Sequence, residues 1–163
     1  MTKLPPHIVD QFRAAYRDAD AIADILIADN LPRGSTLEAR DAVSEPLRQS
    51  LQATAARSVG CPHTGDRVFE SPQPIVVSLA ESIGSCVGCL PNMQRISKKR
   101  GLAHKGCDFC PNETVATTLI AKDHHAVWLA EICDDCATTV TDAQRDAFGE
   151  PQTNPPEDLG DDT

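Results

Sequence analysis

Apolar side chains recur every three or four residues across positions 5–29, and this spacing predicts an amphipathic helix. Pro5 and Pro6 favour a helix start, because the N–H groups of a first helical turn have no partner within the helix. Pro32 and Gly34 then end the pattern. The expected apolar stripe contains Ile8, Phe12, Ala15, Tyr16, Ala19, Ile22, Ala23 and Leu26.

A second helix is expected from Ser35, which forms a capping-box pattern with Glu38. Pro46 interrupts this stretch, so the helix is predicted either to kink or to split, with Ser44 as a new N-cap. Residues 1–58 are therefore expected to form a helical hairpin with one exposed apolar stripe. The cysteine-rich region that follows, or a second copy of the chain in a homodimer, is expected to cover it. The residues expected at that contact are Ile8, Phe12, Tyr16, Ile22 and Leu26.

Short β-prone runs between cysteine pairs replace the helical period after residue 60. Residues 114–120 and 126–132 predict two strands joined around 122–125, and a helix is expected from Cys133 to Phe148. A weaker strand pair is expected upstream. Its two members are Val68-Phe69 and the run from Ile75 to Leu79.

All seven cysteines fall into a pattern of pairs that one histidine completes. In each of two sets, the second pair follows the first after a gap of 22 residues. Two sets of four thiolate or imidazole groups supply the ligands of two tetrahedral sites, so two Zn²⁺ ions per chain are expected. The first set is Cys61, His63, Cys86 and Cys89, and the second is Cys107, Cys110, Cys133 and Cys136.

Disulfides are the competing explanation for these cysteines. The odd cysteine count, the tight pairs and the lack of an apolar secretory segment after Met1 favour metal binding in a soluble, cytoplasmic protein. No apolar run has the roughly 18 to 20 residues needed to cross a bilayer, so no membrane association is expected.

The first set is irregular, because Thr64 stands where a knuckle would place its second cysteine and His63 comes one residue early. Three alternatives stay open. His104 could replace His63 as the fourth ligand, or the site could be a three-ligand catalytic zinc with Asp66 or Glu70 as the base. In the third alternative the pairs interleave, so that the Cys61 pair shares its metal with the Cys107 pair.

Composition supports a metal-stabilised fold, since the chain has only four Phe, one Trp, one Tyr and two Met with which to build a core. The net charge of −9 disfavours general nucleic-acid binding. A third of the basic residues nevertheless fall within 95–105, where they could contact phosphates. These residues are Arg95, Lys98, Lys99, Arg100 and Lys105.

The second set also resembles the N-terminal zinc-binding domain of the ClpX unfoldase family. The matching segments are Cys107-Asp108-Phe109-Cys110, Leu119-Ile120-Ala121 and Ile132-Cys133-Asp134-Asp135-Cys136. The resemblance covers about 35 residues and implies a treble-clef-like fold in which Cys107, Cys110, Cys133 and Cys136 bind zinc. It also implies dimerisation and the docking of adaptors or substrates. The family's ATPase is absent, since the chain has no phosphate-binding loop.

The fold class expected from these patterns is a small, zinc-stabilised α+β protein with treble-clef or zinc-ribbon-like modules. Its expected parts are a helical hairpin (1–58), a first zinc module with a basic linker (59–105), a ClpX-like module (106–148) and a disordered acidic tail (149–163).

The function expected is non-catalytic: a zinc-finger adaptor or regulator that binds another protein. The ClpX resemblance implies a partner in a protease or chaperone system. The alternative is a nucleic-acid-associated regulator that uses residues 95–105. Catalysis is not expected, because the chain lacks a nucleophile elbow and a His-Glu-x-x-His helix. His124 and His125 are interpreted as exposed turn residues.

Overall fold

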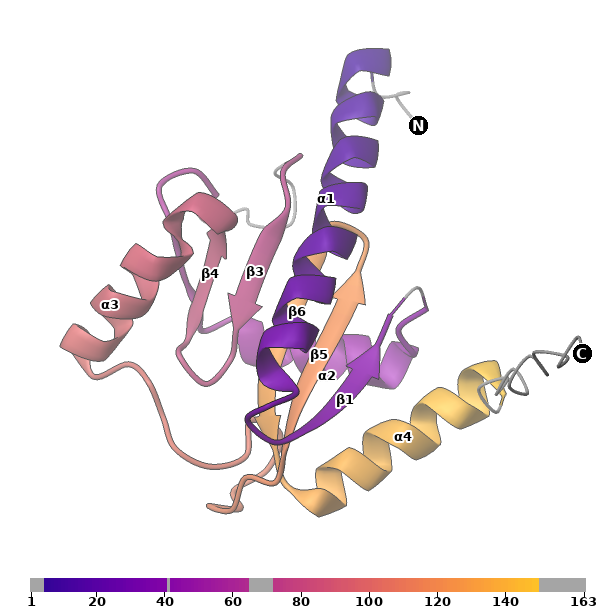
Figure 1. Ribbon diagram of the computed structural model, residues 1–163, viewed down its shortest axis with the longest axis vertical. Coiled ribbons are helices and arrows are strands. Elements are labelled where there is room, and N and C mark those ends of the chain that lie inside the picture. The colour runs from indigo at the N-terminus through magenta and orange to yellow at the C-terminus, as the bar shows by residue number, and fades with distance from the viewer. Residues whose placement is uncertain (1–4, 41, 65–71, 150–163) are drawn as a thin grey trace, which may run out of the picture.

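Two β-hairpins lie side by side in one mixed sheet of six strands (Figure 1). The computed structural model describes residues 5–40, 42–64 and 72–149. One hairpin pairs β3 (Ile75–Ser78) with β4 (Ile83–Cys86), and the other pairs β5 (Thr117–Asp123) with β6 (Ala126–Ile132). The hairpins join through parallel pairing of β3 with β6. Strands β1 (Ser35–Ala39) and β2 (Val59–Gly60) form the edges, giving the order β1-β5-β6-β3-β4-β2.

The larger apolar cluster fills one face of this sheet. Inward-pointing residues of the central strands, among them Val77, Leu119 and Trp128, pack there against Leu47 and Leu51 of helix α2 (Glu45–Ala55). Helix α4 (Asp134–Phe148) adds Val140 to the same cluster. Because alternate residues of a strand point to opposite faces, the neighbours of these strand residues point to the other side.

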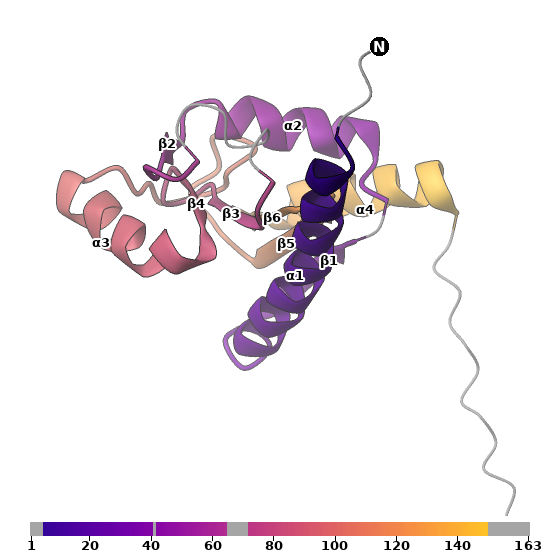
Figure 2. The same ribbon diagram turned by 90° about the horizontal axis from the view of Figure 1, so that it is seen from above.

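Helices α1 (Pro6–Asn30) and α3 (Leu90–Arg100) cover that other side. Ala19 and Ala23 of α1 pack against Ile120 and Val127, the smaller side chains allowing the helix to lie close to the strands. Ile83 packs against α3. It lies in one cross-strand row with Ser78, Leu129 and Ile120, so α3 is on the same side of the sheet as α1. Figure 2 shows α1 and α2 on opposite sides of the sheet.

The structure corrects the helical hairpin that the sequence predicts for residues 1–58. The first helix is confirmed, but residues 35–39 form strand β1, which pairs in parallel with β5 along its whole length. The second helix starts only at Glu45, with Ser44 extended at the N-cap. Pro46 explains this start, because a helix running through it would lose a backbone hydrogen bond. The two helices lie on opposite faces and do not form a hairpin.

The sheet includes strands from each of the three segments 1–58, 59–105 and 106–148. The hairpin predicted near 114–132 and the helix predicted after Cys133 are confirmed. The strand predicted from Ile75 is confirmed as well, but its hairpin partner is β4. The partner predicted for it, Val68-Phe69, lies outside the described residues, as does the tail from residue 150 onward. Within the described part of the chain, no helix is both long and apolar enough to cross a membrane.

Candidate metal centres

Each of the two ligand sets converges on a single point in the structure. The ligand atoms of Cys61, His63, Cys86 and Cys89 lie within 4.8 Å of one another, and so do those of the second set. The sulfur atoms of Cys61 and Cys86 are 3.9 Å apart, far longer than a disulfide bond of about 2.05 Å. All seven cysteines are free thiols. We refer to the two clusters as site 1 (Cys61, His63, Cys86, Cys89) and site 2 (Cys107, Cys110, Cys133, Cys136).

Both sites have the same construction from local elements. A turn supplies the first pair of ligands, a β-hairpin follows, and the second pair lies where the hairpin's last strand leads into a helix. At site 1 the strand is β4, which ends at Cys86, and the 3-10 turn η2 (Val87–Cys89) precedes α3. At site 2 the strand is β6, and Cys133 is the N-cap of α4. The repeated spacing in the sequence therefore corresponds to a repeated order of elements.

Site 2 lies against the larger core cluster. Cys107 and Cys133 are buried members of that cluster, and Phe109 packs on it beside them. The sulfurs of Cys110 and Cys133 are 3.6 Å apart, and the backbone N–H of Phe109 donates to the sulfur of Cys107 at 3.4 Å. An N–H group directed at a sulfur stabilises its thiolate form, which is the form that binds a metal ion.

Asp108 ties the turn of site 2 to strand β6. Its backbone N–H donates to the carbonyl of Glu131 at 2.8 Å, and its carboxylate accepts from the Glu131 N–H at 2.6 Å. His104 lies 2.8 Å from the other carboxylate oxygen. Burial raises the pKa of Asp108 to about 6, against the lowering effects of the Glu131 N–H and of His104. These contacts fix the turn relative to the strand that leads to Cys133.

The pKa values of the thiols in site 2 are shifted in different directions. Burial is the largest influence on Cys107 and raises its pKa, but N–H groups of Cys133, Phe109 and Cys110 together lower that pKa to about 7. The pKa of Cys136 is raised, first by burial and then by its sulfur neighbours. Crowding several thiols together disfavours their simultaneous ionisation. A cation at the centre would remove this repulsion.

In site 1 the thiol with a lowered pKa is that of Cys61, which is almost fully buried. Its N–H donates to the carbonyl of Gly84 at 3.2 Å, which holds the turn against β4. Thr64 lies with its hydroxyl 3.4 Å from the Cys61 sulfur. Burial raises the pKa of Cys61, yet the Thr64 hydroxyl and nearby backbone N–H groups outweigh burial and lower it to about 6. Thr64 occupies the position where a cysteine was expected and contacts a ligand instead of acting as one.

The structure places His63 in site 1. Its Nδ1 lies 3.2 Å from the sulfur of Cys89 and 3.7 Å from that of Cys86. His104 is not part of the cluster and pairs with Asp108 at the other site. Each site takes its ligands from consecutive pairs, so the interleaved arrangement is wrong for this structure. Asp66 and Glu70 lie outside the described residues.

The remaining candidate residues lie away from both sites. Arg95, Lys98, Lys99 and Arg100 are on the exposed side of α3, and Lys105 is exposed after it. In the predicted apolar stripe of α1, Ile8, Phe12, Ile22 and Leu26 are half-buried while Tyr16 is exposed. The buried positions of α1 are Ala15, Ala19 and Ala23, which belong to the predicted stripe, and Ile27, which does not. The two histidines of the β5–β6 turn differ: His124 is exposed as predicted, but His125 is buried against the ring of Phe12.

Two residues next to the ligands of site 2, Asp108 and Gly106, have structural roles that the sequence did not indicate. Asp108 could be found only from its pairing with Glu131, which is 23 residues away. Gly106 has a positive φ of 104°, and a Cβ there would meet the carbonyl oxygen of Asn112 at 2.8 Å. This oxygen accepts the N–H of Cys107 at 2.8 Å. In the sequence, only the glycine next to Cys107 could have indicated that the backbone turns so tightly here.

We expect Gly106→Ala to lower the free energy of unfolding by about 1–3 kcal/mol, because the left-handed backbone and the close carbonyl both exclude a side chain. Gly88→Ala is the matched control, since Gly88 also lies beside metal ligands but has no atom within 4 Å of its Cβ position. Its effect should stay within about 0.5 kcal/mol. Urea unfolding followed by the emission of Trp128 measures both variants. Equal losses in the two variants would contradict this role of Gly106.

Comparisons with protein-family models, with curated proteins and with solved structures gave no match to this chain.

Proposed function

We propose that each site holds one Zn²⁺ ion in a structural role. Thiolate and imidazole ligands in sets of four are typical of structural zinc. A tetrahedron with Zn–S bonds of about 2.3 Å has S···S edges of about 3.8 Å. The distances of 3.9 Å at site 1 and 3.6 Å at site 2 are close to this value. When bound, zinc would fix the four ligands in each set and neutralise part of their thiolate charge.

Each ligand set is complete with four protein groups, which argues against a catalytic metal. A catalytic zinc usually has three protein ligands and keeps a fourth position open for water or substrate. Here both clusters supply four protein ligands, with His63 completing the irregular one. We therefore propose a non-catalytic protein.

The proposed work of this protein is to bind another protein as an adaptor or regulator. The observation that carries the proposal is the construction of site 2, where a turn, a hairpin and the start of a helix bring four thiols together. This order supports the treble-clef-like fold implied by the resemblance to the ClpX family, whose zinc domains dock adaptors and substrates. The resemblance does not include the ATPase domain of that family, so we propose only a docking role for this chain.

Native mass spectrometry tests the metal part of the proposal. We expect two zinc ions per chain, and His63→Ala should reduce the content to one or leave site 1 easily stripped by a weak chelator, because it removes a ligand. His104→Ala is the control and should keep both ions, since His104 belongs to neither cluster and the hydrogen bonds between Asp108 and Glu131 hold the turn of site 2 without it. A wild-type protein with one ion or none, or equal loss in the two variants, would refute the assignment.

Affinity capture with the zinc-loaded chain, followed by reconstitution with the purified captured protein, tests the binding part. The expected result is saturable binding in calorimetry with a fixed stoichiometry. If no purified candidate binds and the chain is strictly monomeric at all concentrations, the proposal of a protein-interaction role fails.

A second candidate function is nucleic-acid binding by helix α3. The helix exposes Arg95, Lys98, Lys99 and Arg100, and among the described residues none of the four forms an ion pair with an acidic side chain. Such a surface suits phosphate contacts. The last three of these residues also lie in the final helical turn, where basic side chains stabilise the carbonyl end of a helix. This local role accounts for them without a nucleic acid, so protein binding remains the first proposal.

Fluorescence anisotropy with labelled duplex and single-stranded DNA at low salt discriminates between the two candidates. If α3 contacts phosphates, the triple variant Lys98→Gln, Lys99→Gln and Arg100→Gln should reduce the slope of log K against log salt by about 0.9 for each lost contact. Absence of binding at low salt, or a slope unchanged in the variant, rejects the nucleic-acid candidate.

A further inference from the structure

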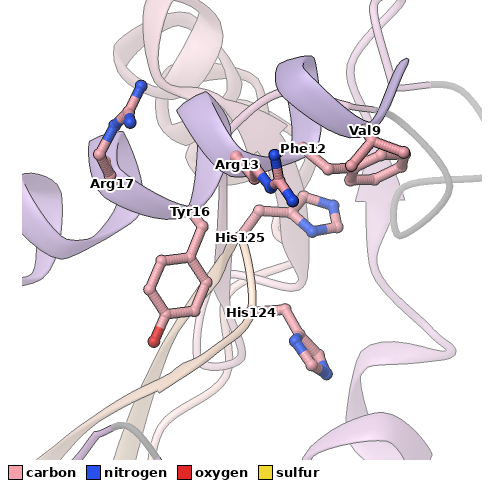
Figure 3. A pocket seen from close by; sticks show the side chains of 7 residues that line it. All are labelled: Val9, Phe12, Arg13, Tyr16, Arg17, His124 and His125. Atoms are coloured by element: carbon pink, nitrogen blue, oxygen red, sulfur yellow. The ribbon is translucent and has the colours of Figure 1, made fainter. Parts of the chain in front are cut away.

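The first turns of helix α1 extend past the β5–β6 hairpin, and a cavity of about 750 Å³ lies at this end (Figures 1 and 3). Its size is within the range of about 300–1,000 Å³ that binding pockets occupy. None of the metal ligands contributes to it. The residues that line it are Val9, Phe12, Arg13, Tyr16, Arg17, His124 and His125.

Apolar and aromatic surfaces form most of the cavity wall. In Figure 3 the side chains of Phe12, Arg13 and Tyr16 extend from α1 on the side of His124 and His125. Tyr16 is 37 % exposed although it belongs to the apolar stripe predicted for this helix. The other end of the stripe packs on the sheet, through Ala19, Ala23 and Ile27. Phe12 and Tyr16 are therefore residues of the stripe that lie beyond its contact with the sheet and line the cavity.

The charge of the cavity wall is opposite to that of the molecule. Among the described residues that line it there are two arginines and two histidines but no acidic residue, although the whole chain has a net charge of −9. Arg17 forms no ion pair with any residue that the structure describes. Arg13 lies 3.4 Å from Asp10, and both side chains are more than 70 % exposed, so that this pair is weak.

Two other acidic side chains lie near this end of the hairpin. Asp20 lies 2.6 Å from the ammonium group of Lys122. Asp123 accepts a hydrogen bond of 2.7 Å from Arg48, and it also lies 3.8 Å from Nε2 of His124 in the cavity wall. Arg13 and Arg17 are therefore the groups of the wall that are open to an incoming anion.

Two contacts hold the aromatic part of the wall in place before anything binds. The rings of Phe12 and His125 meet edge to face with centroids 5.3 Å apart. The ammonium group of buried Lys122 lies 3.2 Å from the centre of the Tyr16 ring. A wall fixed in this way loses little conformational entropy on binding, which favours affinity.

We propose that this cavity is a docking site for an acidic peptide segment of a partner protein that carries a large apolar side chain. The apolar side chain would lie on Val9, Phe12 and Tyr16, and the carboxylates would face Arg13 and Arg17. Arginines recognise carboxylates through paired N–H groups, and an aromatic wall provides apolar contact area. The inference rests on the proposed function only in choosing a protein as the partner.

A fluorescein-labelled peptide in which Glu and Phe alternate provides the probe, titrated with the zinc-loaded full chain. We expect saturable binding, which the double variant Arg13→Glu, Arg17→Glu weakens by about tenfold or more. The matched control is Arg95→Glu, Arg100→Glu, which changes the net charge equally at exposed residues of α3 that do not line the cavity, and it should leave affinity within about twofold. Circular dichroism and metal content establish that both variants fold.

Two altered peptides separate the contributions of charge and apolar surface. Replacing Glu by Lys should abolish binding, and replacing Phe by Ser should weaken it about tenfold, as should Val9→Ser in the protein. Absent binding of the Glu and Phe peptide, or equal effects of the two double variants, overturns the proposal. Two further outcomes also overturn it: binding of 4-phenylbutyrate but not of the peptide, or a dimer that buries Val9 and excludes the peptide.

The outcomes distinguish this inference from the proposed function. A purified partner that binds the Arg13→Glu, Arg17→Glu variant as tightly as the wild type would leave the adaptor role standing and refute the cavity as its site.

Discussion

Cys133→Ser is expected to abolish the cooperative folding of the chain and to reduce its zinc content from two ions to one. Cys133 is a ligand of site 2, and it also belongs to the main apolar cluster together with Trp128. Binding of a structural zinc ion contributes an apparent free energy of about 10–16 kcal/mol, as large as the whole stability of a typical domain. The variant should therefore show red-shifted emission from Trp128, the only tryptophan of the chain, and a flat thermal transition.

Cys86→Ser is the comparison for this experiment. Cys86 ends strand β4, which lies one strand from the edge of the sheet, and it is only half-buried. Its replacement should also remove one ion, but Trp128 should stay buried because the β5–β6 hairpin and site 2 are intact. If both variants unfold alike, or if Cys133→Ser keeps both ions and a normal transition, site 2 does not stabilise the core as the structure indicates.

Helix α1 should not survive the loss of zinc independently of the sheet. The sequence pattern alone predicts that zinc removal unfolds residues 61–148 and leaves some helix at the N-terminus. In the structure, α1 packs on β5 and β6 through Ala19, Ala23 and Ile27. An isolated helix has marginal stability in water, so α1 should melt together with the sheet. Far-ultraviolet circular dichroism during chelation would measure whether helix content falls in one step.

Asp20→Ala is expected to lower the free energy of unfolding by about 2–4 kcal/mol. Lys122 is 1 % exposed near the end of strand β5, and Asp20 lies 2.6 Å from its ammonium group. Removing one partner of a buried ion pair leaves the other charge uncompensated, which costs about 3–5 kcal/mol when both are buried. The value expected here is smaller because the Asp20 side chain is 38 % exposed and water can replace it in part.

Two further variants isolate this ion pair. Asp24→Ala makes the same change one turn later in α1, where the pair with Arg40 is exposed, and should cost less than about 1 kcal/mol. Adding Lys122→Met to Asp20→Ala should restore most of the lost stability, since a buried pair can often be replaced by apolar side chains without loss. Urea denaturation of the three variants provides the measurement. Equal losses for Asp20→Ala and Asp24→Ala, or no recovery in the double variant, would contradict the assigned role of Lys122.

Local chemistry explains what the sequence predicted correctly about the candidate sites. A cysteine pair two residues apart can bind one metal from a single turn, so the spacing of Cys107 with Cys110 and of Cys133 with Cys136 was sufficient to group them. Thr64 and Asp108 could not be assigned in this way. Their roles depend on a sulfur and on a strand residue that come near only when the turns have closed.

The sequence by itself determined helix α1, the β5–β6 hairpin and the two ligand sets, because each depends on residues close together or on a chemically distinctive spacing. Only the tertiary structure decided that residues 35–39 form a strand, that β3 pairs with β6, and that α1 and α2 cover opposite faces. These features depend on pairings between distant segments, which propensity and periodicity do not encode. The burial of Lys122 and the cationic cavity beside Tyr16 follow from the same packing, since both arise where α1 crosses the hairpin and extends beyond it.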